Sequence, residues 1–118
     1  MTARLYVCTT CRAGETVEEG RPVPGARLYA ALATAPQPPG VELVPVECLS
    51  ACNHGCAVAL SQPGSWSYVY GRLTERDAAE ILTGAGAYAT TSDGIVPWRE
   101  RVAIFRKQSL ARIPAADA

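Results

Sequence analysis

The amino-acid sequence predicts a small α/β domain in which a β-α-β unit is followed by a β-β-α unit and a basic C-terminal tail. Three observations predict this fold class. The chain has 118 residues, a length that suits one domain. Its apolar residues form short runs typical of strands, and segments with helical spacing interrupt these runs. We expect residues 1–86 to form the domain and residues 87–118 to form a tail that packs on or beside it.

The first half predicts a strand, a crossover helix and a second strand. Arg4–Cys8 is a short apolar run, typical of a buried strand. Ala26–Ala35 is rich in Ala and carries its larger apolar residues at helical spacing, and prolines follow it directly. Val41–Cys48 is again mostly apolar, but Pro45 lacks a backbone N–H, which favours an edge strand or a bulge. A strand, helix and strand in this order almost always form a right-handed parallel unit.

The next segment predicts a hairpin. Ala57–Leu60 and Trp66–Tyr70 are two strand-like runs, and a Pro-Gly turn lies between them. We therefore expect these two strands to pair in antiparallel fashion.

A second helix is expected after the hairpin. Thr74 and Asp77 have the spacing of a capping box in its acidic form, which marks the start of a helix. Gly84 and Gly86 are expected to end it, because glycine is a poor helix former.

The tail carries an excess of positive charge. Residues 1–98 hold six basic and nine acidic side chains, whereas residues 99–118 hold five basic and two acidic ones. In one interpretation the tail lays its apolar residues on the sheet and leaves its Arg side chains in solvent. In the other, the tail with Trp98 and Phe105 docks an acidic redox partner.

Composition excludes several classes of protein. The formal net charge is zero, so no basic excess points to a nucleic-acid partner. The longest apolar stretches, Cys56–Leu60 and Leu28–Ala33, are far shorter than the roughly 20 residues of a membrane-spanning helix. The apolar run near Met1 is too short for a secretory signal, so we expect a cytoplasmic location and no membrane partner.

Five cysteines are the strongest functional signal. They form a C-x2-C pair and, 36 residues later, a C-x3-C-x3-C group, at Cys8, Cys11, Cys48, Cys52 and Cys56. An odd number without an export signal disfavours a disulfide scaffold. Closely spaced thiols indicate metal ligands or a redox dithiol, because two neighbouring thiolates can hold one metal ion without closing a large loop.

The predicted topology brings the two cysteine groups together. Cys8 ends the first strand and Cys48 ends the second. If these strands are parallel neighbours, both groups emerge at the same carboxyl edge of the sheet, where α/β proteins usually place ligands. No Ser-His-Asp arrangement or Walker-type loop accompanies them, so we expect no substrate chemistry of the protein's own.

Cysteine spacing alone leaves three kinds of site open. Four thiolates suit a [2Fe-2S] cluster and suit a structural zinc ion almost equally well. Cys8-Thr-Thr-Cys11 also matches a dithiol oxidoreductase motif. Such an enzyme usually has its first cysteine at a helix N-terminus, whereas here the next helix is expected only after Pro24. His54, the single histidine, is expected to be a solvated loop residue beside the site.

The stretch from Val46 to Gly55, with Cys48-Leu-Ser-Ala-Cys52 inside it, resembles the C-L-G-x-C loop of the thioredoxin-like [2Fe-2S] ferredoxins and of the related NADH dehydrogenase small subunit. The resemblance covers roughly residues 4–83. The segment from Gly94 to Arg99 also resembles a group of small bacterial predicted metal-binding proteins, some of them associated with cobalamin synthesis genes.

This resemblance implies a thioredoxin-like fold and a [2Fe-2S] cluster held by Cys8, Cys11, Cys48 and Cys52. The chain departs from the family pattern at Cys11, because the family separates its first two ligands by roughly ten residues. Cys56 is expected to be a core thiol, with a substitute ligand as the alternative. The implied function is one-electron transfer between redox partner proteins, by a homodimer, in cobalamin synthesis or another cytosolic pathway. The alternatives are a zinc protein, a metal carrier and a dithiol oxidoreductase.

Overall fold

The first strand, β1 (Ala3–Cys8), lies inside a five-stranded sheet with the strand order β2-β1-β3-β4-β5. The computed structural model describes residues 2–14, 16 and 20–115. β1 pairs with β2 in parallel, and every other pair is antiparallel. The other four strands are β2 (Val41–Val46), β3 (Val58–Ser61), β4 (Ser67–Tyr70) and β5 (Ser109–Ile113).

The predicted β-α-β unit is confirmed. Helix α1 (Pro24–Thr34) connects β1 to β2 and buries Leu28 and Leu32 completely. The helix ends before Ala35, which is extended because the residue ahead of a proline disfavours the helical region. Pro45 lies in β2, at the edge of the sheet, so its missing N–H removes no bond from an interior strand.

The predicted hairpin and the capping box are also confirmed. Strands β3 and β4 pair in antiparallel fashion. Thr74 donates its backbone N–H to Asp77 Oδ2 at 2.8 Å, and the short 3₁₀ helix η2 (Glu75–Asp77) leads into helix α2 (Ala78–Ala89).

The expected end of this helix at its two glycines is wrong, because α2 continues to Ala89. Both glycines allow close packing instead. A Cβ on Gly84 would overlap the ring of Phe105, and one on Gly86 would lie 3.1 Å from Pro38 Cβ. Packing against distant residues, which sequence spacing does not reveal, has outweighed the weak helix propensity of glycine here.

The tail joins the domain through three elements, η3 (Trp98–Glu100), α3 (Ala103–Lys107) and β5. β5 was not expected from the sequence; it extends the sheet by pairing with β4. Phe105 is buried and stacks on Tyr70 with ring centroids 3.8 Å apart. Trp98, in contrast, is 59% exposed.

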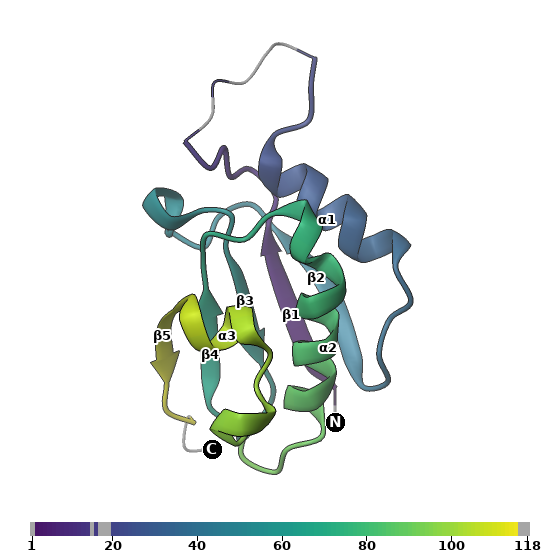
Figure 1. Cartoon of the computed structure of the whole chain (residues 1–118), viewed down its shortest axis with the longest axis vertical. Coiled ribbons are helices and arrows are strands. Elements are labelled where there is room, and N and C mark those ends of the chain that lie inside the picture. Colours follow the sequence, from purple (N-terminus) through teal and green to yellow (C-terminus); the bar gives the residue numbers. More distant parts are fainter. Residues whose placement is uncertain (1, 15, 17–19, 116–118) are drawn as a thin grey trace.

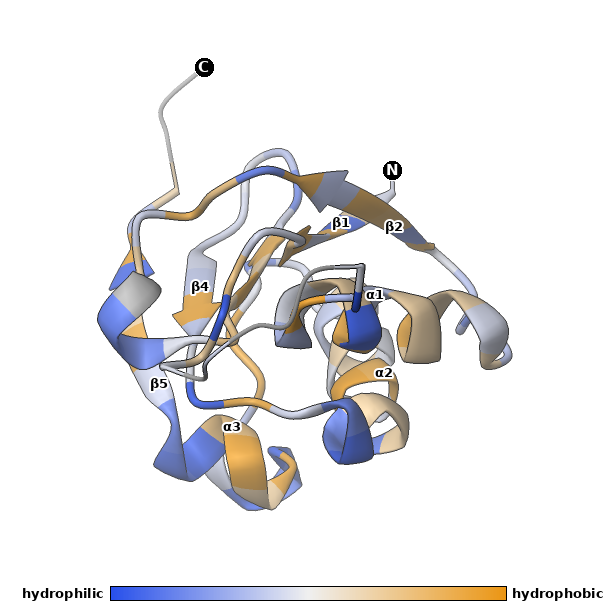
Figure 2. Cartoon of the chain, turned by 90° about the horizontal axis from the view of Figure 1, so that it is seen from above, coloured by the Kyte–Doolittle hydropathy of each residue, from blue (hydrophilic) through white to orange (hydrophobic). Residues whose placement is uncertain are grey.

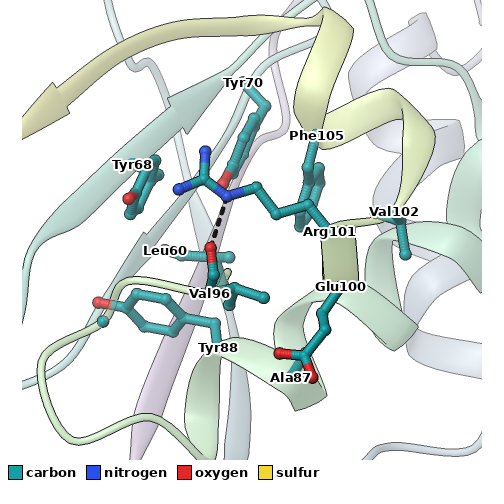
Figure 3. Close-up of a pocket in the computed structure, with 12 residues that line it drawn as sticks. Leu60, Tyr68, Tyr70, Ala87, Tyr88, Val96, Glu100, Arg101, Val102 and Phe105 are labelled. Atoms are coloured by element: carbon teal, nitrogen blue, oxygen red, sulfur yellow. Dashed lines mark hydrogen bonds between the residues drawn. The ribbon is translucent and has the colours of Figure 1, made fainter. Parts of the chain in front are cut away.

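The Arg101 side chain of the tail packs beside the aromatic side chains of the sheet (Figure 3). Its Nε–H donates to Val96 O at 2.7 Å, and its guanidinium lies 5.7 Å from the ring centroid of Tyr68. The hydroxyl of Tyr68 is buried without a hydrogen-bond partner among the described residues. The space that remains there is about 10 Å³, so this region is a packed part of the core.

All three α-helices lie on one side of the sheet (Figures 1 and 2). The covered face holds the core residues of the strands, such as Leu5, Val7 and Leu60. The opposite face carries Arg4 and Tyr6 on β1, which line a shallow groove of about 650 Å³. No helix in the described part of the chain is long and apolar enough to cross a membrane.

Gly84→Ala is expected to lower the free energy of unfolding by about 1–3 kcal/mol, because the new methyl group would overlap the Phe105 ring. Helix propensity alone would predict a gain of about 1 kcal/mol. Urea denaturation of the two proteins measures the difference. Gly86→Ala serves as the control, since its tightest neighbour is the side chain of Pro38, and a stabilised Gly84→Ala variant would contradict the packing of Phe105.

Candidate functional site

The two cysteine loops meet at the carboxyl edge of β1 and β2, as the parallel pairing requires. Cys8 is the last residue of β1 and lies in register with Val46, the last residue of β2. Thr9 donates its backbone N–H to Val46 O at 2.9 Å, and the Cys8 thiol donates to Glu47 O at 3.5 Å. The hydroxyl of Thr10 also donates to Glu47 O. These bonds hold the C-x2-C loop against the residue that precedes Cys48.

The first turn of α1 supports the C-x2-C loop from the other side. Gly25 donates its N–H to Cys11 O at 2.9 Å. A Cβ on Gly25 would overlap the carbonyl oxygen of Cys8 and would lie 3.0 Å from the backbone nitrogen of Cys11. Only glycine fits this position without moving the loop. Sequence reasoning missed Gly25; the Pro-Gly pair at the predicted start of the helix is the signal that marks it.

The structure places Cys8, Cys11 and Cys56 together in the hydrophobic core. Cys56 is 1% exposed, and the other two thiols are 4% exposed. Burial, together with the neighbouring thiols of Cys11 and Cys8, raises the pKa of Cys56 to about 12. Cys56 thus lies in the core, as do Cys8 and Cys11. Its proximity to the C-x2-C pair was not expected, because Cys56 lies far from that pair in the sequence.

Cys48 differs from these three thiols because it is exposed. Its Sγ accepts the backbone N–H of Ser50 at 3.2 Å, in a turn where Ser50 has a φ of +56°. Cys52 follows at the start of the short 3₁₀ helix η1 (Cys52–His54), and its side chain lies outside the described part of the structure.

His54 lies at the end of η1 and is half-buried rather than fully solvated. Its carbonyl oxygen accepts the N–H of Arg72 at 2.6 Å, which ties η1 to the segment that follows β4.

The donor chemistry at this edge fits an iron–sulfur cluster, although the described side chains do not form a closed metal site. The Cys8 thiol bonds to the carbonyl oxygen of Glu47, the residue before Cys48, and thiolates are the usual ligands of such clusters. Among the described residues, no three Cys, His, Asp or Glu side chains are grouped to hold one metal ion. The described part of the site therefore consists of three thiols buried in the core, those of Cys8, Cys11 and Cys56, and the exposed Cys48 in the neighbouring loop.

Comparison with known proteins identifies both a family and a fold. A family model described as a protein of unknown function, DUF1636, matches residues 5–115. No curated protein matches the sequence.

Three solved structures of the thioredoxin-like [2Fe-2S] ferredoxin from Aquifex aeolicus are similar. The first has a TM-score of 0.55 at 16% identity, covering 94% of this chain and 92% of that one. The wild-type structure gives 0.57 at 16% identity, with coverage of 93% and 97%. A cysteine-to-serine variant gives 0.53 at 15% identity, with coverage of 92% and 98%. This similarity confirms the predicted thioredoxin-like fold.

Alkylation of the metal-free protein with iodoacetamide at pH 8 is expected to modify Cys48 first and to leave Cys56 unmodified. Cys48 is exposed, whereas Cys56 is buried and its raised pKa keeps it a thiol at this pH. The folded protein favours the protonated thiol of Cys56, because folding raises the pKa of this thiol from 9.0 to about 12. The stability that this thiol contributes is therefore complete below pH 9 and is lost as the pH rises toward about 12. Mass spectrometry of the digested protein measures both rates. Denatured protein, in which both thiols react alike, is the control, and equal rates in the native protein would contradict the arrangement.

Proposed function

The chain belongs to the DUF1636 family of proteins of unknown function, and we propose that it is an electron-transfer protein carrying one [2Fe-2S] cluster. The observation that carries this proposal is the junction of two cysteine loops at one sheet edge. The Cys8 thiol there bonds to Glu47, the residue before Cys48. The thioredoxin-like fold supports it, because the Aquifex proteins with the same fold are described as [2Fe-2S] ferredoxins.

We propose Cys8, Cys11, Cys48 and Cys52 as the cluster ligands, with Cys56 as the substitute ligand. Such a cluster, when bound, supplies reversible one-electron reduction. The protein's own residues hold and shield it. Gly25 and the first turn of α1 fix the C-x2-C loop, and the burial of Cys8 and Cys11 excludes water on that side.

Exposure of Cys48 supports a carrier role. A protein that passes electrons to partners needs one accessible side at its redox centre, and Cys48 supplies that side. We propose that the protein has no substrate chemistry of its own and acts in the cytoplasm. Its partners would be another redox protein and a second copy of this chain. The pathway we propose is cobalamin synthesis or another reductive pathway, for which the sequence resemblance is the support.

A dithiol oxidoreductase is a second candidate, and one observation favours it. The first turn of α1 contacts the Cys8–Cys11 loop through the bond from Gly25 to Cys11 O. The helix therefore begins beside this pair despite the long intervening segment, which removes the objection raised by the sequence. This candidate leaves Cys48 and Cys52 without a role, so we rank it second.

Protein purified without oxygen is expected to be red-brown, to contain about two iron and two sulfide per chain, and to bleach with dithionite. A UV–visible spectrum with iron, sulfide and zinc assays on the same sample measures this. A colourless protein with one zinc ion would replace the proposal with a zinc site or a metal carrier. A colourless, metal-free protein would favour the dithiol oxidoreductase.

Cys→Ser replacement at Cys8, Cys11, Cys48 or Cys52 is expected to abolish or reshape the visible spectrum, because each removes a proposed ligand. Cys56→Ser is the matched control and is expected to leave the spectrum largely intact. Iron content per folded chain, with circular dichroism as the check on folding, accompanies each spectrum. Loss of colour in Cys56→Ser with colour retained in Cys48→Ser would show that Cys56, and not Cys48, is a ligand.

A further inference from the structure

Three segments meet beside the second cysteine group. Arg72 donates its backbone N–H to His54 O at 2.6 Å, which places it against η1. Gly71 donates to Gln108 O at 3.0 Å, which brings the end of α3 to the same turn. Arg106 and Lys107 are the last two residues of α3, the helix that lies beside β4 and β5 (Figure 1). We call Arg72, Arg106 and Lys107 the basic rim.

The basic rim carries uncompensated positive charge. All three side chains are exposed, and none of them forms an ion pair within the described part of the chain. The acidic residues that follow Arg72 in the sequence are already engaged. Glu75 pairs with Arg27 at 3.2 Å, and Asp77 accepts the N–H of Thr74 in the capping box.

Arg72 occupies a backbone conformation that its side chain does not favour. Its φ is +55°, in the left-handed region that glycine or asparagine adopts most readily. Local stability would therefore select a different residue at this position, and the arginine makes no described ion pair that would compensate. An outlier of this kind, beside a candidate site, is typical of a residue retained for function.

We propose that the basic rim is a docking surface for a carboxylate-rich face of a redox partner protein. This inference rests on the proposed electron-transfer function and adds the chemistry of the partner. The backbone of Arg72 contacts η1, so a protein bound at the rim lies beside the second cysteine group. Complementary charge raises the rate of encounter and orients the partner toward that edge. The overall net charge of zero disfavours nucleic acid as the occupant.

Lys107 provides a direct test, because it is the only lysine in the chain. The probe is a fluorescein-labelled decaglutamate peptide, used at low salt with the whole protein as purified. A carbodiimide couples a lysine amine to a carboxylate only at direct contact. We expect mass spectrometry to find the peptide linked to Lys107, and the yield to fall as salt increases.

A relocated lysine is the matched control. In the double variant Lys107→Arg with Arg99→Lys, charge is unchanged but the lysine lies in η3 instead of at the end of α3. We expect at least about a three-fold lower cross-linking yield for this variant, the scale of a surface charge contact. Equal yields at the two positions, or no binding of decaglutamate, would overturn the docking surface.

Arg72→Gly separates docking from folding. It relieves the left-handed conformation, so we expect an unchanged or higher midpoint of thermal unfolding. Loss of one rim charge should weaken decaglutamate binding, measured by fluorescence anisotropy, by about three-fold. Unchanged affinity would overturn the role of Arg72. Tighter binding of a ten-nucleotide oligothymidylate than of decaglutamate would overturn the choice of a protein partner.

These experiments do not depend on a bound cluster, so the two proposals fail separately. Iron and sulfide assays on the same samples report the electron-transfer function. Peptide linked to Lys107 in a cluster-free protein supports the docking surface alone. A cluster with equal linkage at both lysine positions supports the cluster alone and overturns the docking surface.

Discussion

Parallel pairing of β1 with β2 is the constraint on which the cysteine site depends. Two parallel neighbours end at the same edge, so the loops after Cys8 and Val46 must start side by side. Parallel strands require a crossover, and α1 supplies it while placing its first turn against the C-x2-C loop. One pairing therefore brings together thiols that are far apart in the sequence.

Helices on a single side of the sheet divide this site into an inner and an outer part. The thiols of Cys8, Cys11 and Cys56 belong to the buried core, and burial raises the pKa of Cys56. Cys48 lies outside that core, and the basic rim lies farther along the same edge, beside η1. A redox centre with one shielded and one accessible side is consistent with a carrier that meets its partners at the sheet edge.

Much of this arrangement can be predicted from the sequence, because local signals determine it. The parallel unit, the edge position of Pro45, the hairpin and the Thr74–Asp77 capping box all follow from spacing and turn residues. The features that could not be predicted depend on contacts between distant residues. Helix α2 passes through Gly84 because Phe105, about twenty residues later, packs there. In the same way, Cys56 joins Cys8 and Cys11, and β5 joins β4, through tertiary packing alone.

The separation of the two cysteine loops also has a consequence for synthesis of the protein. Cys11 and Cys48 are separated by 36 residues in the sequence. The pairing of β1 with β2 brings their loops together, so it requires that β2 has been made. A ribosome adding about 5–20 residues per second needs roughly two to seven seconds to make that segment. During this interval the nascent chain presents Cys8 and Cys11 before their folded surroundings exist. The first pair of thiols is therefore open to oxidation during translation until β2 has been made.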